Sequence, residues 1–289
     1  VRYPAYACGV AGIRPSFGRI PAYNPTMGGE RPLSAQLMST QGPLARSVRD
    51  LRLALSVMAE GDIRDPWWMP APLDGPPPPR PIRVALCVDP AGTGVHPAVA
   101  EAVQRAGRIL AAAGYAVEEA APPDFPGTAT DWEALSRTEG RIHLRDAFMK
   151  VADGGARETF DAMMARAPQL DLAAWTAVAA RRTTRQRQWA QFLKTYPILL
   201  LPVSSEPPFP QGLDVAGQQA FDSVFRAQLP MLAAPLLGLP GVSVPTGLAE
   251  GLPMGVQLMA ARWREDLILD AAEVIEAACP MPTPIDPRG

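Results

Sequence analysis

The sequence has few of the features that mark membrane, disulfide-rich or zinc-binding proteins. No apolar run approaches the ~20 residues of a membrane-spanning helix, and the longest candidate, residues 231–244, is interrupted by two prolines and two glycines. Cysteine is scarce, because Cys8, Cys87 and Cys279 lie far apart, are odd in number and lack metal-ligand spacing. We therefore expect a cytoplasmic protein without a membrane segment, a disulfide framework or a zinc site.

Charge and the common catalytic side chains are sparse as well. The 27 basic and 29 acidic residues leave a formal net charge of −2, so composition gives no attraction to nucleic acid or to an anionic membrane. The histidines, His96 and His143, and the lysines, Lys150 and Lys194, have no partners at catalytic or metal-ligand spacing. Phosphate-binding glycine motifs and G-x-S-x-G are absent, and Ser243 in GVSVP is interpreted as structural. The residues alone therefore indicate no catalytic constellation and no metal or organic cofactor.

The chain does have enough apolar sequence for a large core. Hydrophobic residues make up 47% of its 289 positions, which favours a globular fold over disorder. Residues 1–42 are dense in glycine and proline, so we expect short strands and tight loops there rather than long helices. The proline-rich residues 71–81 are expected to form an extended connector inside one domain that takes in residues 1–289.

Periodic apolar segments predict strands that alternate with helices. A first helix is predicted from apolar residues at three- and four-residue spacing: Leu44, Val48, Leu51, Leu55 and Met58. Residues 82–88, 97–114 and 115–120 have the pattern of a strand, a helix and a second strand, which should form a right-handed parallel unit. Further elements are expected at 130–195 (mostly helical), 196–203 (a central strand), 221–229 (a helix), 241–245 and 254–259 (strands) and 265–279 (a helix). The predicted fold class is α/β, with a mixed central β-sheet covered by helices on both faces.

The opening residues carry a specific pattern of glycine, proline and basic residues. In VRYPAYACGVAGIRPSFGRIP, the matching positions are Arg2, Pro4, Cys8, Gly9, Gly12, Arg14, Pro15, Ser16, Gly18 and Pro21. They resemble the segment of the amidase signature family that directly follows its nucleophilic serine. Three later segments resemble that family in the same order: GPLARSVRDL, YPILLLPV and GLPGVSVPTGLAEGLPMGVQLMA. The resemblance spans the chain and is weakest over residues 62–195.

Membership of this family would imply hydrolysis of a small-molecule carboxamide by a Ser-Ser-Lys triad, through an acyl-enzyme and without a cofactor. The resemblance places the nucleophile immediately before Val1 and the other two triad residues further upstream, so no catalytic residue is expected in this chain. We therefore expect an N-terminal segment to complete the domain. The competing hypothesis is a catalytically inactive scaffold or binding subunit that begins at Val1. Both the hydrolase and the inactive scaffold could form a homodimer.

The resemblance also suggests two residues that support the active-site loop. Arg2 resembles an arginine that braces the nucleophile loop against an upstream aspartate, and a structural ion pair is favoured over direct contact with substrate. Cys8 is expected near the start of a strand, as a small buried side chain without a reactive role.

Three residues near the predicted helix 221–229 are candidates for the substrate pocket. Phe221 and Phe225 are possible apolar walls, with core packing as the alternative. At the position of Gln228, the glutamine-using relatives that prepare aminoacyl-tRNA carry an acid that reads the substrate's amino group. A neutral glutamine there favours neutral or aryl amides, unless Gln228 is an ordinary surface residue. Pro235 stands where the family usually has asparagine, which leaves one wall of the pocket unassigned.

Overall fold

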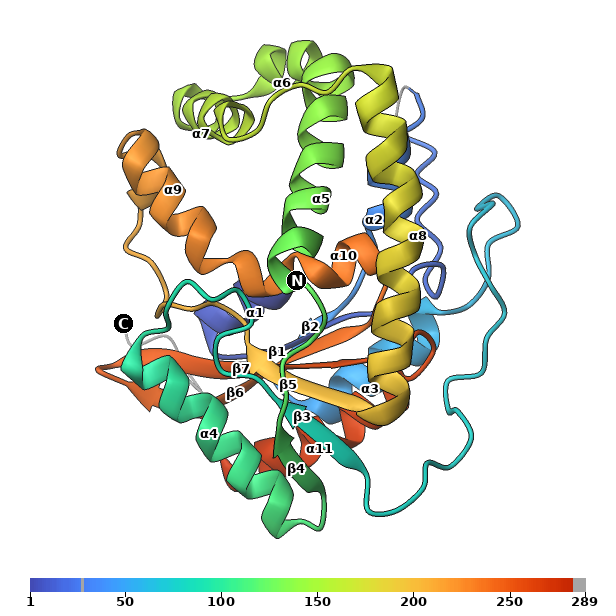
Figure 1. Ribbon diagram of the computed structural model, residues 1–289, viewed down its shortest axis with the longest axis vertical. Coiled ribbons are helices and arrows are strands. Elements are labelled where there is room, and N and C mark those ends of the chain that lie inside the picture. The colour runs from blue at the N-terminus through green and yellow to red at the C-terminus, as the bar shows by residue number, and fades with distance from the viewer. Residues whose placement is uncertain (27–28, 283–289) are drawn as a thin grey trace, which may run out of the picture.

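A seven-stranded mixed β-sheet runs through the centre of the computed structural model, which describes residues 1–26 and 29–282 (Figure 1). The strand order is β2-β1-β6-β7-β5-β3-β4. Strands β2, β1, β6, β7 and β5 pair antiparallel, whereas β5, β3 and β4 pair parallel. In chain order the strands are β1 (Ala11–Arg14), β2 (Leu44–Ala45), β3 (Arg83–Leu86), β4 (Ala116–Glu119), β5 (Ile198–Pro202), β6 (Gly241–Ala249) and β7 (Leu252–Ala260).

Alternate residues of the central strands enter two different apolar cores. In β5, Ile198 and Leu200 pack into one core, whereas Leu199 and Leu201 pack into the other, because successive side chains of a strand point to opposite faces. Helices α3 (Val48–Met58), α4 (Pro97–Ala112) and α11 (Glu265–Ala278) cover the first face. Helices α8 (Leu172–Thr195) and α10 (Ala233–Leu237) cover the second (Figure 1). The predicted mixed sheet with helices on both faces is confirmed.

A group of helices extends away from the second face of the sheet. Helix α5 (Phe125–Glu139) starts at the sheet and packs along α8, and buried Asp131 of α5 pairs with Arg181 and Arg185 of α8. At the far end of α5, a five-residue π-helix leads into α6 (Arg145–Val151) and α7 (Gly154–Ala165) (Figure 1). Helix α9 (Gln218–Ala227) contacts α7. The mostly helical character predicted for residues 130–195 is confirmed.

The predicted strand–helix–strand unit is present. Strands β3 and β4 are parallel and joined by α4, whose Val99, Val103, Ala106 and Leu110 are buried as expected. Residues 71–82 contain no helix or strand. No helix among the described residues is long and apolar enough to cross a membrane.

The first 45 residues differ from prediction in three places. Arg2–Cys8 forms a short helix, α1, which ends at Gly9 in the left-handed region, with φ 65°. A second short helix, α2, spans Leu33–Met38. Leu44 does not belong to the predicted helical stripe, since it pairs with Gly12 in the sheet and is 45% exposed. Helix α3 begins only after Ser47, whose Oγ accepts the Asp50 N–H at 3.1 Å.

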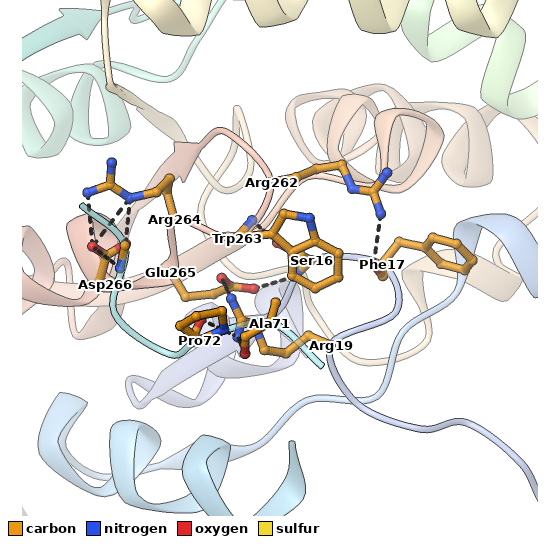
Figure 2. A network of polar contacts seen from close by, with 11 residues as sticks. Ser16, Phe17, Arg19, Ala71, Pro72, Arg262, Trp263, Arg264, Glu265 and Asp266 are labelled. Atoms are coloured by element: carbon orange, nitrogen blue, oxygen red, sulfur yellow. Dashed lines mark hydrogen bonds and ion pairs between the residues drawn. The ribbon is translucent and has the colours of Figure 1, made fainter. Parts of the chain in front are cut away.

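A buried ion pair joins the beginning of the chain to its last helix (Figure 2). Arg19 and Glu265 lie 2.8 Å apart, and each side chain is only 1% exposed. The same carboxylate accepts the Ser16 backbone N–H at 2.7 Å through its other oxygen. The Ser16 Oγ in turn accepts the backbone N–H of Trp263 at 2.8 Å. This bond holds Trp263 at φ 68°, an unusual value for a residue with a side chain.

The same pair also holds the connector in place. Arg19 donates to the carbonyls of Ala71 and Pro72 at 3.0 and 2.8 Å. Further along the connector, the backbone N–H of Gly75 donates to the Asp266 carboxylate at 3.2 Å. The extended connector is therefore fixed by hydrogen bonds to two segments that lie far from it in sequence.

Replacing Glu265 with glutamine should destabilise the protein strongly. The Glu265→Gln variant leaves the Arg19 charge buried without a counterion, which costs about 3 to 5 kcal/mol in the free energy of unfolding. Asp270→Asn is the matched control, because it breaks the exposed pair with Arg52, in which Asp270 is 62% exposed. That loss should stay below about 1 kcal/mol. Urea unfolding of the natural chain that contains these residues measures both, and equal losses would contradict the proposed importance of the buried pair.

Candidate functional site

Arg2 lies in the interior, where it connects α1 to the middle of the sheet. Its guanidinium donates to the side-chain oxygen of Gln257 in β7 and, at 2.7 Å, to the carbonyl of Met231. Gln257 itself donates to the carbonyl of Pro230 at 3.1 Å. Two adjacent side chains therefore hold both the start of α1 and the turn at 230–231.

Burial of this arginine is nearly complete, and its hydrogen-bond partners are uncharged. Arg2 is 6% exposed, and burial lowers its pKa to about 9. Among the described residues it forms no ion pair with a carboxylate. The predicted brace between Arg2 and an upstream aspartate concerns a residue outside this chain, so this role stays a prediction.

The first residue of the chain lies on the same face of the sheet. Gly12 pairs with Ser243, and Ser243 pairs with Gln257, so all three point to one face. A Cβ on Gly12 would lie 3.0 Å from the carbonyl oxygen of Val1, so a side chain there would press on the start of α1. The start of α1 therefore adjoins this face of the sheet. Arg14, two residues after Gly12, points the same way.

A large cavity begins at Arg14 and extends between α5, α7 and α2. Its volume is about 1250 Å³. Apolar side chains make up much of its wall: Met38, Trp132, Phe160, Met163 and Met164, together with Pro235. Polar and charged side chains are fewer and include Arg14, Ser34, Arg137 and Glu139. Such a cavity suits an apolar or aromatic molecule oriented by a small number of polar contacts.

Two arginines at this cavity are buried with unsatisfied donors. Arg14 and Arg137 are 7% and 5% exposed, and the Nε of each has no hydrogen-bond partner among the described residues. Burial lowers the pKa of Arg14 to about 9 and that of Arg137 to about 10. The Arg137 guanidinium lies 5.2 Å from the ring centre of Trp132 and 5.5 Å from that of Phe225. These rings hold it by cation–π contact.

The predicted pocket residues lie behind the cavity wall. Phe221 and Phe225 are 6% and 8% exposed and pack into a cluster with Ala129 and Leu232. Trp132 and Met163 of the cavity wall pack against this cluster, and none of Phe221, Phe225 and Gln228 belongs to the described lining. Gln228 caps the C-terminus of α9 and is half-buried. Direct contact of these three with substrate remains a prediction, whereas Pro235 does line the cavity.

The expected burial of Cys8 is wrong. Cys8 is an exposed free cysteine at the last position of α1, before the strand rather than in the core. The interior side of this short helix is taken by Ala5 and Tyr6, which are 0% and 2% exposed. Support of the active-site loop by Cys8 stays a prediction, but it cannot come from packing in a buried core of the described chain.

The charged residues that line the cavity were not identified as a pocket from the sequence: Arg14, Arg137, Glu139, Asp153 and Asp214. The available signal was the run TDWEALSRTEGR, in which charged residues interrupt every apolar stripe. In α5 these charges lie on inner surfaces, because Asp131 and Arg137 are buried. No three His, Cys, Asp or Glu side chains within residues 1–26 and 29–282 gather as metal ligands would.

Comparison with known proteins gives a consistent family. The family model described as Amidase matches residues 1–269. An indoleacetamide hydrolase from Bradyrhizobium diazoefficiens is 45% identical over 278 residues, which cover 96% of this chain and 53% of the relative. An indoleacetamide hydrolase from Bradyrhizobium japonicum is 43% identical over 96% of this chain and 60% of its own length. The chain thus spans about half the length of the first relative, and under two thirds of the second.

A solved structure agrees on the fold. A bacterial aryl acylamidase, described as an amidase signature enzyme, has a TM-score of 0.76 at 20% identity, over 97% of this chain and 60% of its own. At that identity the likeness concerns the fold alone.

Arg2→Lys should destabilise the protein although it keeps the charge. A lysine ammonium lacks the planar fork that reaches Gln257 and the Met231 carbonyl together, so we expect the loss of one buried hydrogen bond, about 2 kcal/mol. Arg83→Lys is the control, because Arg83 makes a similar two-bond contact with Glu118 at the exposed edge of the sheet. Its cost should stay below about 1 kcal/mol. If urea unfolding gives Arg2→Lys no greater effect than Arg83→Lys, the anchoring role of Arg2 is wrong.

Proposed function

The chain belongs to the amidase family, and from this premise we propose that the protein hydrolyses a neutral aryl-substituted carboxamide of the indoleacetamide type to a carboxylate and ammonia. The observation that carries the proposal is the 45% identity to an indoleacetamide hydrolase across 96% of this chain. The cavity supports the same class of substrate, since its wall includes three aromatic and three methionine side chains.

The proposed reaction proceeds through an acyl-enzyme formed on a serine immediately before Val1. The serine Oγ would attack the amide carbon while its proton passes through a bridging serine to an upstream lysine. The C–N bond then breaks, and ammonia leaves with that proton. Water adds to the resulting ester by the same relay, which releases the carboxylate and restores the serine. No cofactor takes part in this scheme.

The residues of this chain would position that serine and its substrate. Arg2 and Gln257 fix the start of α1. This helix begins two residues after the proposed nucleophile. Rigid support of this kind matters because misplacement of a reacting group by about 1 Å can cost a hundredfold in rate. The cavity that starts at Arg14 would receive the aryl part of the substrate.

The proposal predicts labelling by a serine-reactive fluorophosphonate and release of ammonia from indoleacetamide. Both are to be measured on the natural chain that contains these residues. Replacing the residue immediately before Val1 with alanine should abolish labelling and lower kcat at least a thousandfold. Ser243→Ala is the control serine: its buried Oγ has no partner in the described structure, so its removal leaves labelling and turnover close to the parent values.

Two outcomes would count against this function. An intact, folded protein that neither labels nor releases ammonia would favour the inactive scaffold. Loss of both labelling and activity in Ser243→Ala, and not in the upstream variant, would show that the nucleophile is not the residue before Val1.

A further inference from the structure

We infer that Glu139 selects substrates that carry an N–H donor on their ring system, by accepting a hydrogen bond from that group inside the cavity. This inference rests on the proposed function and adds a residue that determines specificity. Glu139 is the last residue of α5, is 9% exposed and lines the cavity that begins at Arg14.

One oxygen of Glu139 is occupied, and this fixes the side chain. Oε2 accepts the backbone N–H of Ser34 at 2.6 Å. Ser34 lies in the first turn of α2, where Pro32 at the N-cap offers no side-chain acceptor. Glu139 therefore caps α2 from a position 105 residues away. A carboxylate tied at one oxygen presents the other in a defined place.

The second oxygen, Oε1, has no hydrogen-bond partner among the described residues. Arg137 does not supply one, because residues two apart on a helix do not face each other. The carboxylate whose charge acts on the pKa of Arg137 is instead Glu133. Oε1 is not among the fully buried unpaired oxygens of the described residues, so it is open to the cavity that Glu139 lines and can accept a hydrogen bond from a donor that enters.

The charges around the cavity are of both signs, because Asp153 and Asp214 line it together with Glu139, Arg14 and Arg137. Arg14 and Arg137 line the same cavity, and both are buried and positively charged at pH 7. An ammonium group would be repelled by both arginines and attracted by the three carboxylates, so charge alone does not select it. A neutral ring N–H is not repelled by the arginines, and Trp132, Phe160 and Met163 supply apolar contacts for the ring that carries it.

The test compares two amides that differ in a single group. Indoleacetamide carries the ring N–H, and the benzofuran analogue has an oxygen in its place. The natural chain that contains these residues should favour the indole amide in kcat/KM at least tenfold, because a site built to accept a hydrogen bond rejects an analogue that lacks the donor. Glu139→Gln should reduce this preference to within about threefold. The glutamine oxygen can still accept the Ser34 N–H, so its NH₂ group faces the cavity and meets the ring N–H donor to donor.

Glu133→Gln is the matched control on the same helix. Glu133 pairs with Arg166 at 2.9 Å and does not belong to the described cavity lining, so its removal should leave the preference between the two amides unchanged. Thermal unfolding of each variant shows whether Glu139→Gln keeps α2 in place. Equal turnover of the two amides by the parent protein would overturn the inference, as would an equal loss for both amides in Glu139→Gln.

Calorimetric binding of the same two amides separates failure of the inference from failure of the proposed function. Tighter binding of the indole amide, lost in Glu139→Gln, would uphold the inference even if neither amide were hydrolysed, and the absence of turnover would then refute the proposed function alone. Equal binding of the two amides would overturn the role of Glu139 whatever the turnover.

Discussion

The contact between Arg2 and Gln257 is the constraint on which the geometry of the candidate site depends. It joins the first helix to a central strand of the sheet although the residues are 255 positions apart. The arginine must enter the interior to make it, and burial there lowers its pKa to about 9. The two side chains also hold the turn at 230–231, which leads into α10 beside the cavity. The start of α1, the sheet and one cavity wall are therefore positioned by one small group of hydrogen bonds.

Much of the fold could be predicted from the sequence because its apolar pattern matches the burial pattern. The run at Ile198–Pro202 is continuous because this strand is covered on both faces, and the stripe of α4 faces one core only. The pattern misleads near the start of the chain, where this relation is weak. Helix α1 is a single short segment that ends at a glycine, too brief for periodicity to show. Leu44 fitted the helical spacing, yet the cap at Ser47 starts α3 after it.

The candidate site was less predictable, because its polar residues are set by contacts between distant segments. The glycine and proline pattern located the stretch next to the proposed nucleophile, and the aromatic residues Phe221 and Phe225 were found close to the cavity but one layer behind it. Glu139 depends on the backbone of Ser34, and Arg137 on the rings of Trp132 and Phe225. Neither of these contacts leaves a pattern in the local sequence. Cys8 was misplaced because a small residue fits an exposed helix end as well as a core.

The ion pair between Arg19 and Glu265 determines when, during synthesis, the loop at residues 16–19 can reach its final conformation. Ribosomes synthesise a chain from its N-terminus, so residues 16–19 leave the ribosome long before residue 265 is made. Until then, the Arg19 charge and the Ser16 N–H lack the carboxylate that both use in the finished fold. The loop that follows the proposed nucleophile thus reaches its final conformation only when the last helix docks. A nascent chain cannot complete this part of the site before Glu265 has been synthesised.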